Sequence, residues 1–245
     1  MGRRILIIDI ETVAYDNAHE CLEPFMEEMK TRNKKDLEKL AEEITEKKAK
    51  MIRKSALTPM ASKVVAIGFG HVNLKDMDNP FDEDVTSCET ELLLIENEDE
   101  RGLLLRAKEV MDKYNEYVTF NGRGFDFPYL MFRGAINNVP FNLPIGKYNN
   151  KDGHFDLAIH IYNLSLIANI DSTVQYVSMK KWIRFFGISG EKKNVMDMDY
   201  LTNPQEFLDY LGEDIRFTWE MFKRFQNHFE GRFSRWLTIR QKNKN

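Results

Sequence analysis

Two carboxylates follow a short apolar run near the start of the chain. The segment Arg4–Ile10 reads Arg-Ile-Leu-Ile-Ile-Asp-Ile, and Glu11 and Thr12 come next. Because the run is short, β-branched and bounded by polar residues, it predicts a buried strand. Residues i and i+2 of a strand point to the same face, so we expect Asp9 and Glu11 to project together. Two acids this close repel unless a cation lies between them, although exposed acids at a strand end are an alternative.

Another acid follows a glycine turn in the middle of the chain. Residues 121–130 read Asn-Gly-Arg-Gly-Phe-Asp-Phe-Pro-Tyr-Leu, directly after a predicted strand at Tyr117–Phe120. Asp126 opens the predicted helix Phe125–Ala135, where the helix dipole would stabilise its negative charge. An ordinary capping acid explains the same pattern. The glycines do not make a phosphate loop, because no Lys-Ser/Thr pair follows and G-x-G-x-x-G is incomplete.

A tyrosine and an acid stand four residues apart late in the chain. Tyr210 and Asp214 fall in a predicted helix, Pro204–Phe229, and positions i and i+4 share one helical face. Three apolar residues near the same stripe indicate that this face turns toward the protein body: Phe207, Phe217 and Met221. A carboxylate there needs a cation or hydrogen-bond donors, although an ordinary aromatic–acid pair is the plainer interpretation.

The elements that must position these residues form an α/β pattern. Further strands are predicted at Lys63–Gly70 and within Val85–Ile95, and residues 138–152 indicate a loop. Helices are predicted at Glu98–Tyr114, Leu157–Ile167 and Thr173–Phe186, and before Pro204 a helix start is marked by Asn203. Strands come early and helices late, with one strand–helix alternation between, so we expect a mixed-sheet α/β fold.

The stretch after the first strand differs from the rest in composition. From Tyr15 to about Lys54 it is dense in charge of both signs, with apolar residues at helical spacing. The pattern predicts an exposed helical insertion at about residues 15–57, with no catalytic motif of its own. We expect residues 1–245 to form one domain, with a basic tail at 232–245.

Composition limits the class of protein. Hydrophobic residues make up 42% of the 245-residue chain, which is typical of a globular protein with a core. No apolar run reaches the ~18 residues of a membrane span, and nothing at the start reads as a signal peptide. Two cysteines are too few for a disulfide framework, so the reducing cytoplasm is expected. A net charge of −4 would ordinarily argue against nucleic acid as a partner.

The order of the three motifs resembles a known superfamily. D-x-E on the first strand, N-x-x-x-F-D at a strand–helix junction and Y-x-x-x-D on a late helix resemble the DEDD 3′–5′ exonucleases, in their tyrosine-bearing (DEDDy) branch. Asn121–Leu130 is similar to the proofreading domain of family B DNA polymerases. With residues 58–70 and 153–157, it also resembles stand-alone "PolB-like" predicted exonucleases. The resemblance covers about 190 of the 245 residues and leaves no room for a polymerase.

The resemblance implies an RNase H-like fold and two divalent metal ions. Asp9, Glu11 and Asp214 would hold one ion, and Asp9 would bridge to a second that Asp126 reaches directly or through water. Oxygen-only ligands suit Mg²⁺ or Mn²⁺. Tyr210, whose hydroxyl has an ordinary pKa near ~10, is a poor base and would orient the attacking water.

The resemblance further implies a substrate and the residues that contact it. Thr12, Asn121 and Phe125 would touch the terminal nucleotide of single-stranded DNA, and its 3′ end would release nucleoside 5′-monophosphates. RNA is an alternative substrate. A non-catalytic module that binds nucleic acid or a partner is an alternative function. The acidic balance does not exclude nucleic acid, since bound metal would supply part of the attraction for phosphate.

Overall fold

A mixed sheet runs through the part of the chain that the structure describes. The computed structural model describes residues 3–28, 45, 47–48, 50–51, 54–74, 86–144, 153–167, 178–190 and 200–242. Within these ranges the sheet has five strands, in the order β3-β2-β1-β4-β5. They are β1 (Arg3–Ala14), β2 (Ser62–Leu74), β3 (Thr86–Leu94), β4 (Tyr117–Thr119) and β5 (His154–Asp156). β1, β2 and β3 pair antiparallel, whereas β4 and β5 run parallel to β1.

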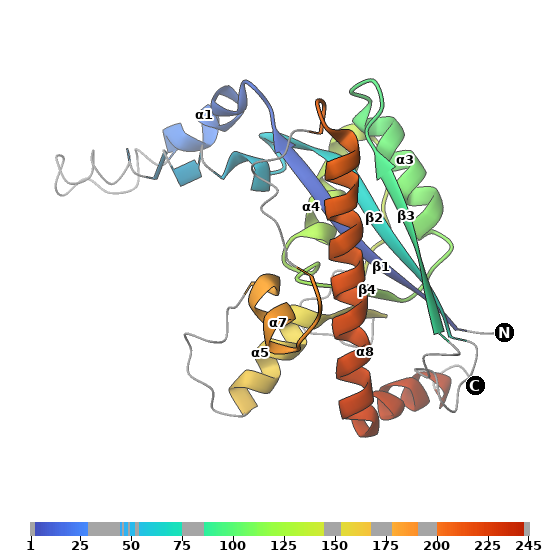
Figure 1. The fold of residues 1–245 in the computed structure, drawn as a ribbon. Helices are drawn as coiled ribbons and strands as arrows, with labels where there is room; N and C mark the ends of the chain where they lie inside the picture. Colours follow the sequence, from blue (N-terminus) through green and yellow to red (C-terminus); the bar gives the residue numbers. More distant parts are fainter. Residues whose placement is uncertain are drawn as a thin grey trace.

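Helices cover both faces of this sheet (Figure 1). Helices α3 (Glu100–Met111) and α4 (Asp126–Asn137) contribute to one apolar cluster, with the even-numbered β1 residues 6, 8 and 10. On the other face lie α5 (Leu157–Ile167), α7 (Met179–Phe185) and α8 (Pro204–Lys242), with residues 5 and 7. The two-residue period of the strand therefore assigns Asp9 and Glu11 to the face that α8 covers. No helix among the described residues combines the length and apolar character needed to cross a membrane.

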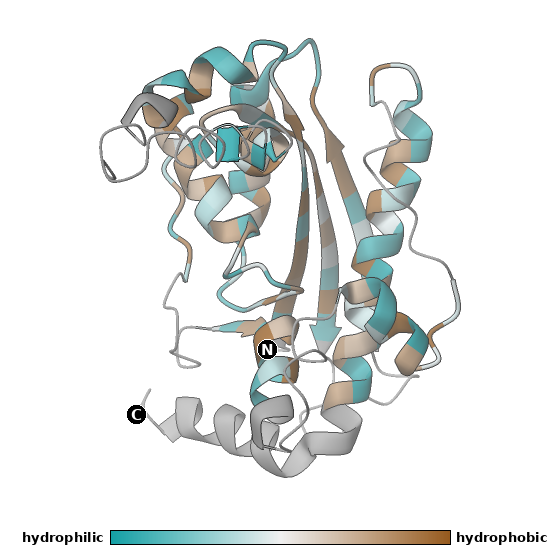
Figure 2. Ribbon diagram, turned by 90° about the vertical axis from the view of Figure 1, so that its left-hand side faces the viewer, coloured by the Kyte–Doolittle hydropathy of each residue, from teal (hydrophilic) through white to brown (hydrophobic). Residues whose placement is uncertain are grey.

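The first half of β1 is apolar and buried, and the acids Asp9 and Glu11 follow it. Ile5, Leu6, Ile7 and Ile8 are all buried, so the first half of β1 is apolar on both faces. Figure 2 shows the strands of the sheet coloured mostly as hydrophobic, while the helices around them mix both colours. A strand covered by helices on both sides is expected to lack alternation, and the run that precedes Asp9 fits this rule.

Most predicted elements are present, with shifted ends. The strands β1 to β4 and the helices α3, α4 and α5 occur where the sequence predicts them. Helix α8 begins after Asn203, whose side-chain oxygen accepts from the Glu206 amide at 3.4 Å. Its predicted end at Phe229 is wrong: the helix continues to Lys242, and Phe233, Trp236 and Leu237 prolong the helical spacing of apolar residues beyond Phe229. Strand β5 was not predicted, since three residues are too few for a period to show.

Two further predictions fall partly on residues that the structure does not describe. The predicted helix Thr173–Phe186 is represented by α7, which begins only at Met179, and residues 168–177 lie outside the described part. After β1 the structure has α1 (Ala18–Glu28) and a short 3-10 helix, η2 (Ser55–Leu57), while residues 29–44 lie outside it. Of the predicted loop 138–152, residues 138–144 are irregular as expected.

A buried ion pair ties the helices of one face to the strands. Arg133 on α4 pairs with Glu100 on α3, and their relative exposures are only 3% and 7%. Glu100 also accepts from the Val64 amide at 2.8 Å, and Arg133 donates to the Pro59 carbonyl at 2.8 Å and to the Tyr15 hydroxyl. Since removing one partner of a buried pair typically costs about 3–5 kcal/mol, this network fixes how both ends of the β1–β2 connection meet the helices.

Two glycines of β2 let α8 lie directly on the sheet. A Cβ on Gly68 would lie 2.9 Å from Leu211 Cγ and 3.0 Å from Ile215 Cγ1, and one on Gly70 would lie 3.0 Å from Ile215 Cγ2. All three distances are too short for an unstrained contact, so a larger residue would force the helix outward. Gly68 is the cross-strand partner of Asp9, which makes this close approach a property of the acid-bearing part of β1.

This packing predicts opposite effects for two glycine-to-alanine changes. Gly68→Ala should lower the free energy of unfolding by about 1–3 kcal/mol, because the added methyl overpacks the interface with α8. Gly212→Ala, inside α8, should raise it by up to about 1 kcal/mol, since its Cβ would meet only Leu92 Cδ1, at an ordinary 3.6 Å. Urea unfolding of both variants measures the difference. Equal stabilities would contradict the close-approach argument.

Candidate metal and nuclease site

Strand β1 supplies two carboxylates to one place on the sheet. Asp9 and Glu11 pair across the ladder with Gly68 and Ala66, so both lie on the face covered by α8. Immediately after Glu11 the register shifts, because Thr12 pairs with Val64. A bulge of this kind bends a strand and re-aims its side chains, and bulges are over-represented beside active sites. Glu11 is 9% exposed and Asp9 is half-buried, so both are partly shielded from solvent.

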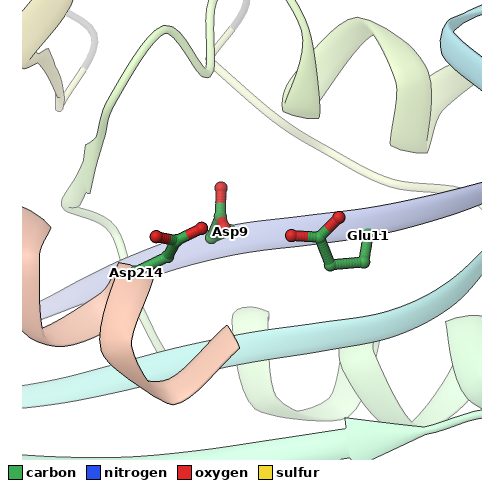
Figure 3. Close-up of side chains that lie close together, drawn as sticks. All are labelled: Asp9, Glu11 and Asp214. Atoms are coloured by element: carbon green, nitrogen blue, oxygen red, sulfur yellow. The ribbon is translucent and has the colours of Figure 1, made fainter. Parts of the chain in front are cut away.

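Helix α8 supplies a third carboxylate and a tyrosine. Asp214 is 1% exposed, and it brings a carboxylate oxygen to within 4.8 Å of one from Asp9 and one from Glu11. Figure 3 shows Asp9 and Glu11 side by side on β1, with Asp214 reaching the same place from the helix. Leu211 and Ile215, which touch Gly68, flank Asp214 in sequence. The close approach of α8 to β2 therefore brings Asp214 to the strand acids.

Tyr210 lies beside this cluster as a protonated hydroxyl. Burial raises its pKa far above the ordinary value, and the charges of Asp214, Glu11 and Asp9 raise it further. A side-chain hydrogen bond to Asp214 acts in the same direction, because the hydroxyl donates to the carboxylate. Tyr210 can therefore donate a hydrogen bond at neutral pH but cannot serve as a base.

Asp126 approaches the cluster from a different element. It begins α4, is 2% exposed, and its Oδ1 accepts the backbone amide of Ile10 at 3.1 Å. Ile10 lies between Asp9 and Glu11 in sequence, so this bond fixes Asp126 against the acid-bearing part of β1. Its carboxylate is not within the 4.8 Å group formed by the other three acids. The structure thus brings all four predicted carboxylates to one region and places three of them in mutual contact range.

The turn before Asp126 is held by the buried carboxylate of Asp156. Asp156, 1% exposed at the end of β5, accepts the amides of Asn121 and Arg123 at 2.9 Å each. It also accepts the first amides of α5, from Ala158 at 3.0 Å and Ile159 at 3.4 Å. Asp156 therefore caps one helix and anchors the turn that leads into another, a structural role.

The three residues expected to touch substrate stand next to Glu11 or shortly before Asp126 in sequence. Thr12 follows Glu11, is half-buried, and its hydroxyl donates to the Ala56 carbonyl of η2 at 2.6 Å. Asn121 is exposed and has a left-handed backbone with φ of 67°. Phe125 is half-buried, with its ring centroid 5.2 Å from that of Tyr129. Thr12 thus fastens η2 to the end of β1, a contact that the motif alone did not predict.

The cluster has the donor chemistry of a site for a hard divalent cation. Its donors are carboxylate oxygens from Asp9, Glu11 and Asp214, with neither sulfur nor imidazole among them. Mg²⁺ and Mn²⁺ prefer such oxygen donors, whereas zinc sites favour nitrogen and sulfur. A cation would also offset the mutual repulsion of three carboxylates in this space. Glu213, the neighbouring acid, is exposed and pairs with Arg216 instead.

The fold and the site define a class of protein. It is an α/β domain in which the first strand of the sheet, a central helix and the last helix each supply acids to one site. Within that class, the chain belongs to the family described as predicted 3′–5′ exonucleases related to the exonuclease domain of PolB, whose model matches residues 57–243. Asp9 and Glu11 precede the matched range. It is the fold that brings them to Asp214.

A solved structure has the same fold. The family B DNA polymerase of the hyperthermophilic archaeon Pyrobaculum calidifontis matches with a TM-score of 0.51 and 17% identity. The match covers 91% of this chain and 24% of the polymerase, so this chain spans about a quarter of that protein. No curated protein matches the chain. The similarity confirms the predicted exonuclease-like α/β fold, a mixed sheet flanked by helices.

The clustered charges predict that one substitution has opposite effects with and without metal. In chelator, Asp214→Asn should raise the free energy of unfolding by about 1 kcal/mol, because a like charge is removed. With Mg²⁺ or Mn²⁺ at about 100 times the Kd, the wild type should gain about 2.7 kcal/mol and the variant much less. Thermal unfolding with and without metal measures both effects. Glu213→Gln is the matched control and should respond to metal as the wild type does.

The buried His154, on the strand that also carries Asp156, predicts a loss of stability in acid. Burial lowers the pKa of His154, which is 1% exposed and hydrogen-bonded to Thr119, to about 3, and the charge of Arg123 adds to this. In the unfolded chain His154 has an ordinary pKa of about 6.5, so between about pH 6.5 and 3 it is protonated there but stays neutral in the folded protein. Stability should therefore fall as pH drops from about 6.5 to 3, by up to about 1.4 kcal/mol per unit. In chelator, His154→Gln should show a shallower slope, and an equal slope would contradict the assignment.

Proposed function

We propose that this protein is a metal-dependent 3′–5′ exonuclease that shortens single-stranded DNA from its 3′ end and releases nucleoside 5′-monophosphates. The observation that carries the proposal is the convergence of Asp9, Glu11 and Asp214 within 4.8 Å, with the hydroxyl of Tyr210 beside them. The family and the fold support the reaction class. The substrate and the roles of individual residues are our proposal.

Each acid has a role that follows from its position. Asp9, Glu11 and Asp214 would hold one divalent cation, Mg²⁺ or Mn²⁺, and Asp9 and Asp126 would hold a second. Bound there, such ions lower the pKa of an attacking water and stabilise the 3′ oxygen that leaves. The Ile10 amide donates to Oδ1 of Asp126, which holds that carboxylate against β1 between the positions of Asp9 and Glu11.

Tyr210 acts as a donor and positioning group. Because its pKa is raised, the side chain stays a neutral phenol that can hold a water molecule near Asp214. A neutral hydroxyl adds no charge to a site that must accept a phosphodiester. Proton removal from the water therefore falls to another group, with Tyr210 fixing its direction.

The residues around the cluster are suited to contact the last nucleotide. Phe125 presents a half-buried ring next to Asp126, backed by the buried ring of Tyr129, and aromatic rings stack on bases of any sequence. Thr12, which follows Glu11, and Asn121, in the turn before Asp126, carry further polar groups. A contact to a 2′-hydroxyl is what would separate RNA from DNA, so RNA stays the alternative substrate.

We also assign the whole chain, residues 1–245, to a single domain. In support, α8, near the end of the chain, contacts β1, near its start, and packs on β2 at Gly68 and Gly70. The segment at about 15–57 is an insertion within that domain, in keeping with α1 and η2. Residues 232–242 of the basic tail belong to α8.

Degradation of 5′-labelled oligonucleotides tests the function. Wild type with Mn²⁺ should shorten single-stranded DNA stepwise from the 3′ end, and Asp9→Ala should lower kcat by at least about 1,000-fold, because the metal-binding site is lost. Tyr210→Phe should keep metal-dependent stabilisation yet lower kcat, which separates positioning from metal binding.

Two comparisons decide between the alternatives. RNA and DNA oligonucleotides of one sequence, in competition, identify the preferred substrate. Glu213→Gln is the matched control, since its carboxylate lies next to Asp214 in sequence but pairs with Arg216. If wild type and Asp9→Ala degrade neither DNA nor RNA beyond background, the enzyme assignment is wrong and a binding module remains.

A further inference from the structure

Helix α7 carries an unusual combination of positive charge and exposed aromatic surface. Residues 178–190 contain three basic residues and no acid, in a chain whose net charge is −4. Lys181 and Arg184 are exposed, and Phe185, at 75% exposure, is the most exposed large hydrophobic residue among those described. Trp182 lies beside it and is half-buried. We call these four residues the α7 surface.

The rings of this region form a connected group. The Trp182 ring lies 5.5 Å from Phe185 in an edge-on arrangement and 5.7 Å from Phe186 in a stacked one. Phe186 in turn lies 5.5 Å from Phe225 of α8. Met179 and Ile183 anchor the other side of α7 in the core. The aromatic group is therefore held in place by the core and by α8, while Phe185 is open to solvent.

The α7 surface lies on the same side of the sheet as the carboxylate cluster. Figure 1 shows α7 beside α8, the helix that supplies Asp214. The chain after α7 contacts α8 near that acid, since Arg216 donates to the Ser189 carbonyl at 2.9 Å. From Asp214 to Phe225, the residue that meets Phe186, is eleven residues, or about 16 Å at about 1.5 Å of rise per residue.

We propose that the α7 surface binds the single-stranded nucleic acid upstream of the 3′ end that the carboxylate cluster holds. This inference rests on the proposed function and adds the path of the strand. Bases stack on aromatic rings whatever their sequence, and adjacent cations attract the phosphates between them. At about 3.4 Å per stacked nucleotide, a strand would reach α7 about five nucleotides from its end.

Charge favours this occupant over others. The carboxylate cluster repels polyanions when it holds no cation, so a strand needs a positive surface elsewhere to bind. Lys181 and Arg184 provide it beside rings that an extended strand can cover. An acidic peptide would be attracted by the same charges, but it would not depend on the distance to a 3′ end, and the experiment below uses that difference.

The test uses the full chain, three variants of the α7 surface and one control variant. Phe185→Ala and Lys181→Ala, alone and combined, alter exposed side chains and should leave the fold intact by circular dichroism. Phe132→Ala is the matched control, since this phenylalanine of α4 is 57% exposed and belongs to the helix on the opposite face. All variants are measured for binding of a fluorescent oligo(dT) of about 15 nucleotides with Ca²⁺ in place of Mg²⁺, by anisotropy.

The combined variant should weaken this binding about tenfold, and Phe132→Ala should not change it. In hydrolysis with Mn²⁺, the combined variant should raise KM on the same oligonucleotide with kcat unchanged, and should match wild type on a trinucleotide too short to reach α7. Wild-type affinity in the combined variant, or an equal KM rise on the trinucleotide, would overturn the proposal. Anisotropy needs no turnover, so an inactive wild type refutes the proposed function while binding still decides this inference.

Discussion

The repulsion among three carboxylates within 4.8 Å is the constraint that the fold has to overcome. Asp9 and Glu11 cannot avoid each other, because they are two residues apart on one strand. Asp214 is brought to them by α8, which packs on β2 where Gly68 and Gly70 have no side chains to keep it away. Buried apolar contacts along α8 therefore offset an electrostatic cost concentrated at one point, and a cation would relieve it.

The supports of Asp126 are of a different kind. Asp126 begins α4, which is joined to α3 by the buried Glu100–Arg133 pair. The turn before α4 donates two backbone amides to Asp156. Hydrogen bonds have narrow geometry, whereas apolar packing tolerates small slides. The protein thus places Asp126 by directional hydrogen bonds and Asp214 by the packing of α8. The hydrogen bond from the Ile10 amide ties Asp126 to β1, the strand on which α8 also lies.

Local patterns in the sequence predicted more of the site than of its supports. Strand period placed Asp9 and Glu11 on one face, and helix spacing placed Tyr210 beside Asp214, because both rules concern residues near in sequence. Periodicity could not show that β1 and α8 meet; only the order of motifs suggested it. The bonds from the Asn121 and Arg123 amides to Asp156 and the close approach at Gly68 depend on partners distant in sequence, which no local pattern contains.

The carboxylate cluster draws on residues from opposite ends of the chain, and this has a consequence for synthesis. Asp9 and Asp214 are separated by 205 positions, so a ribosome must add 205 residues after Asp9 before the cluster can assemble. Chains fold from the N-terminus as they emerge, and long-range contacts form late. A nascent or prematurely terminated chain therefore carries the acids of β1 without their partner, and holds no complete cluster while it remains near messenger and ribosomal RNA.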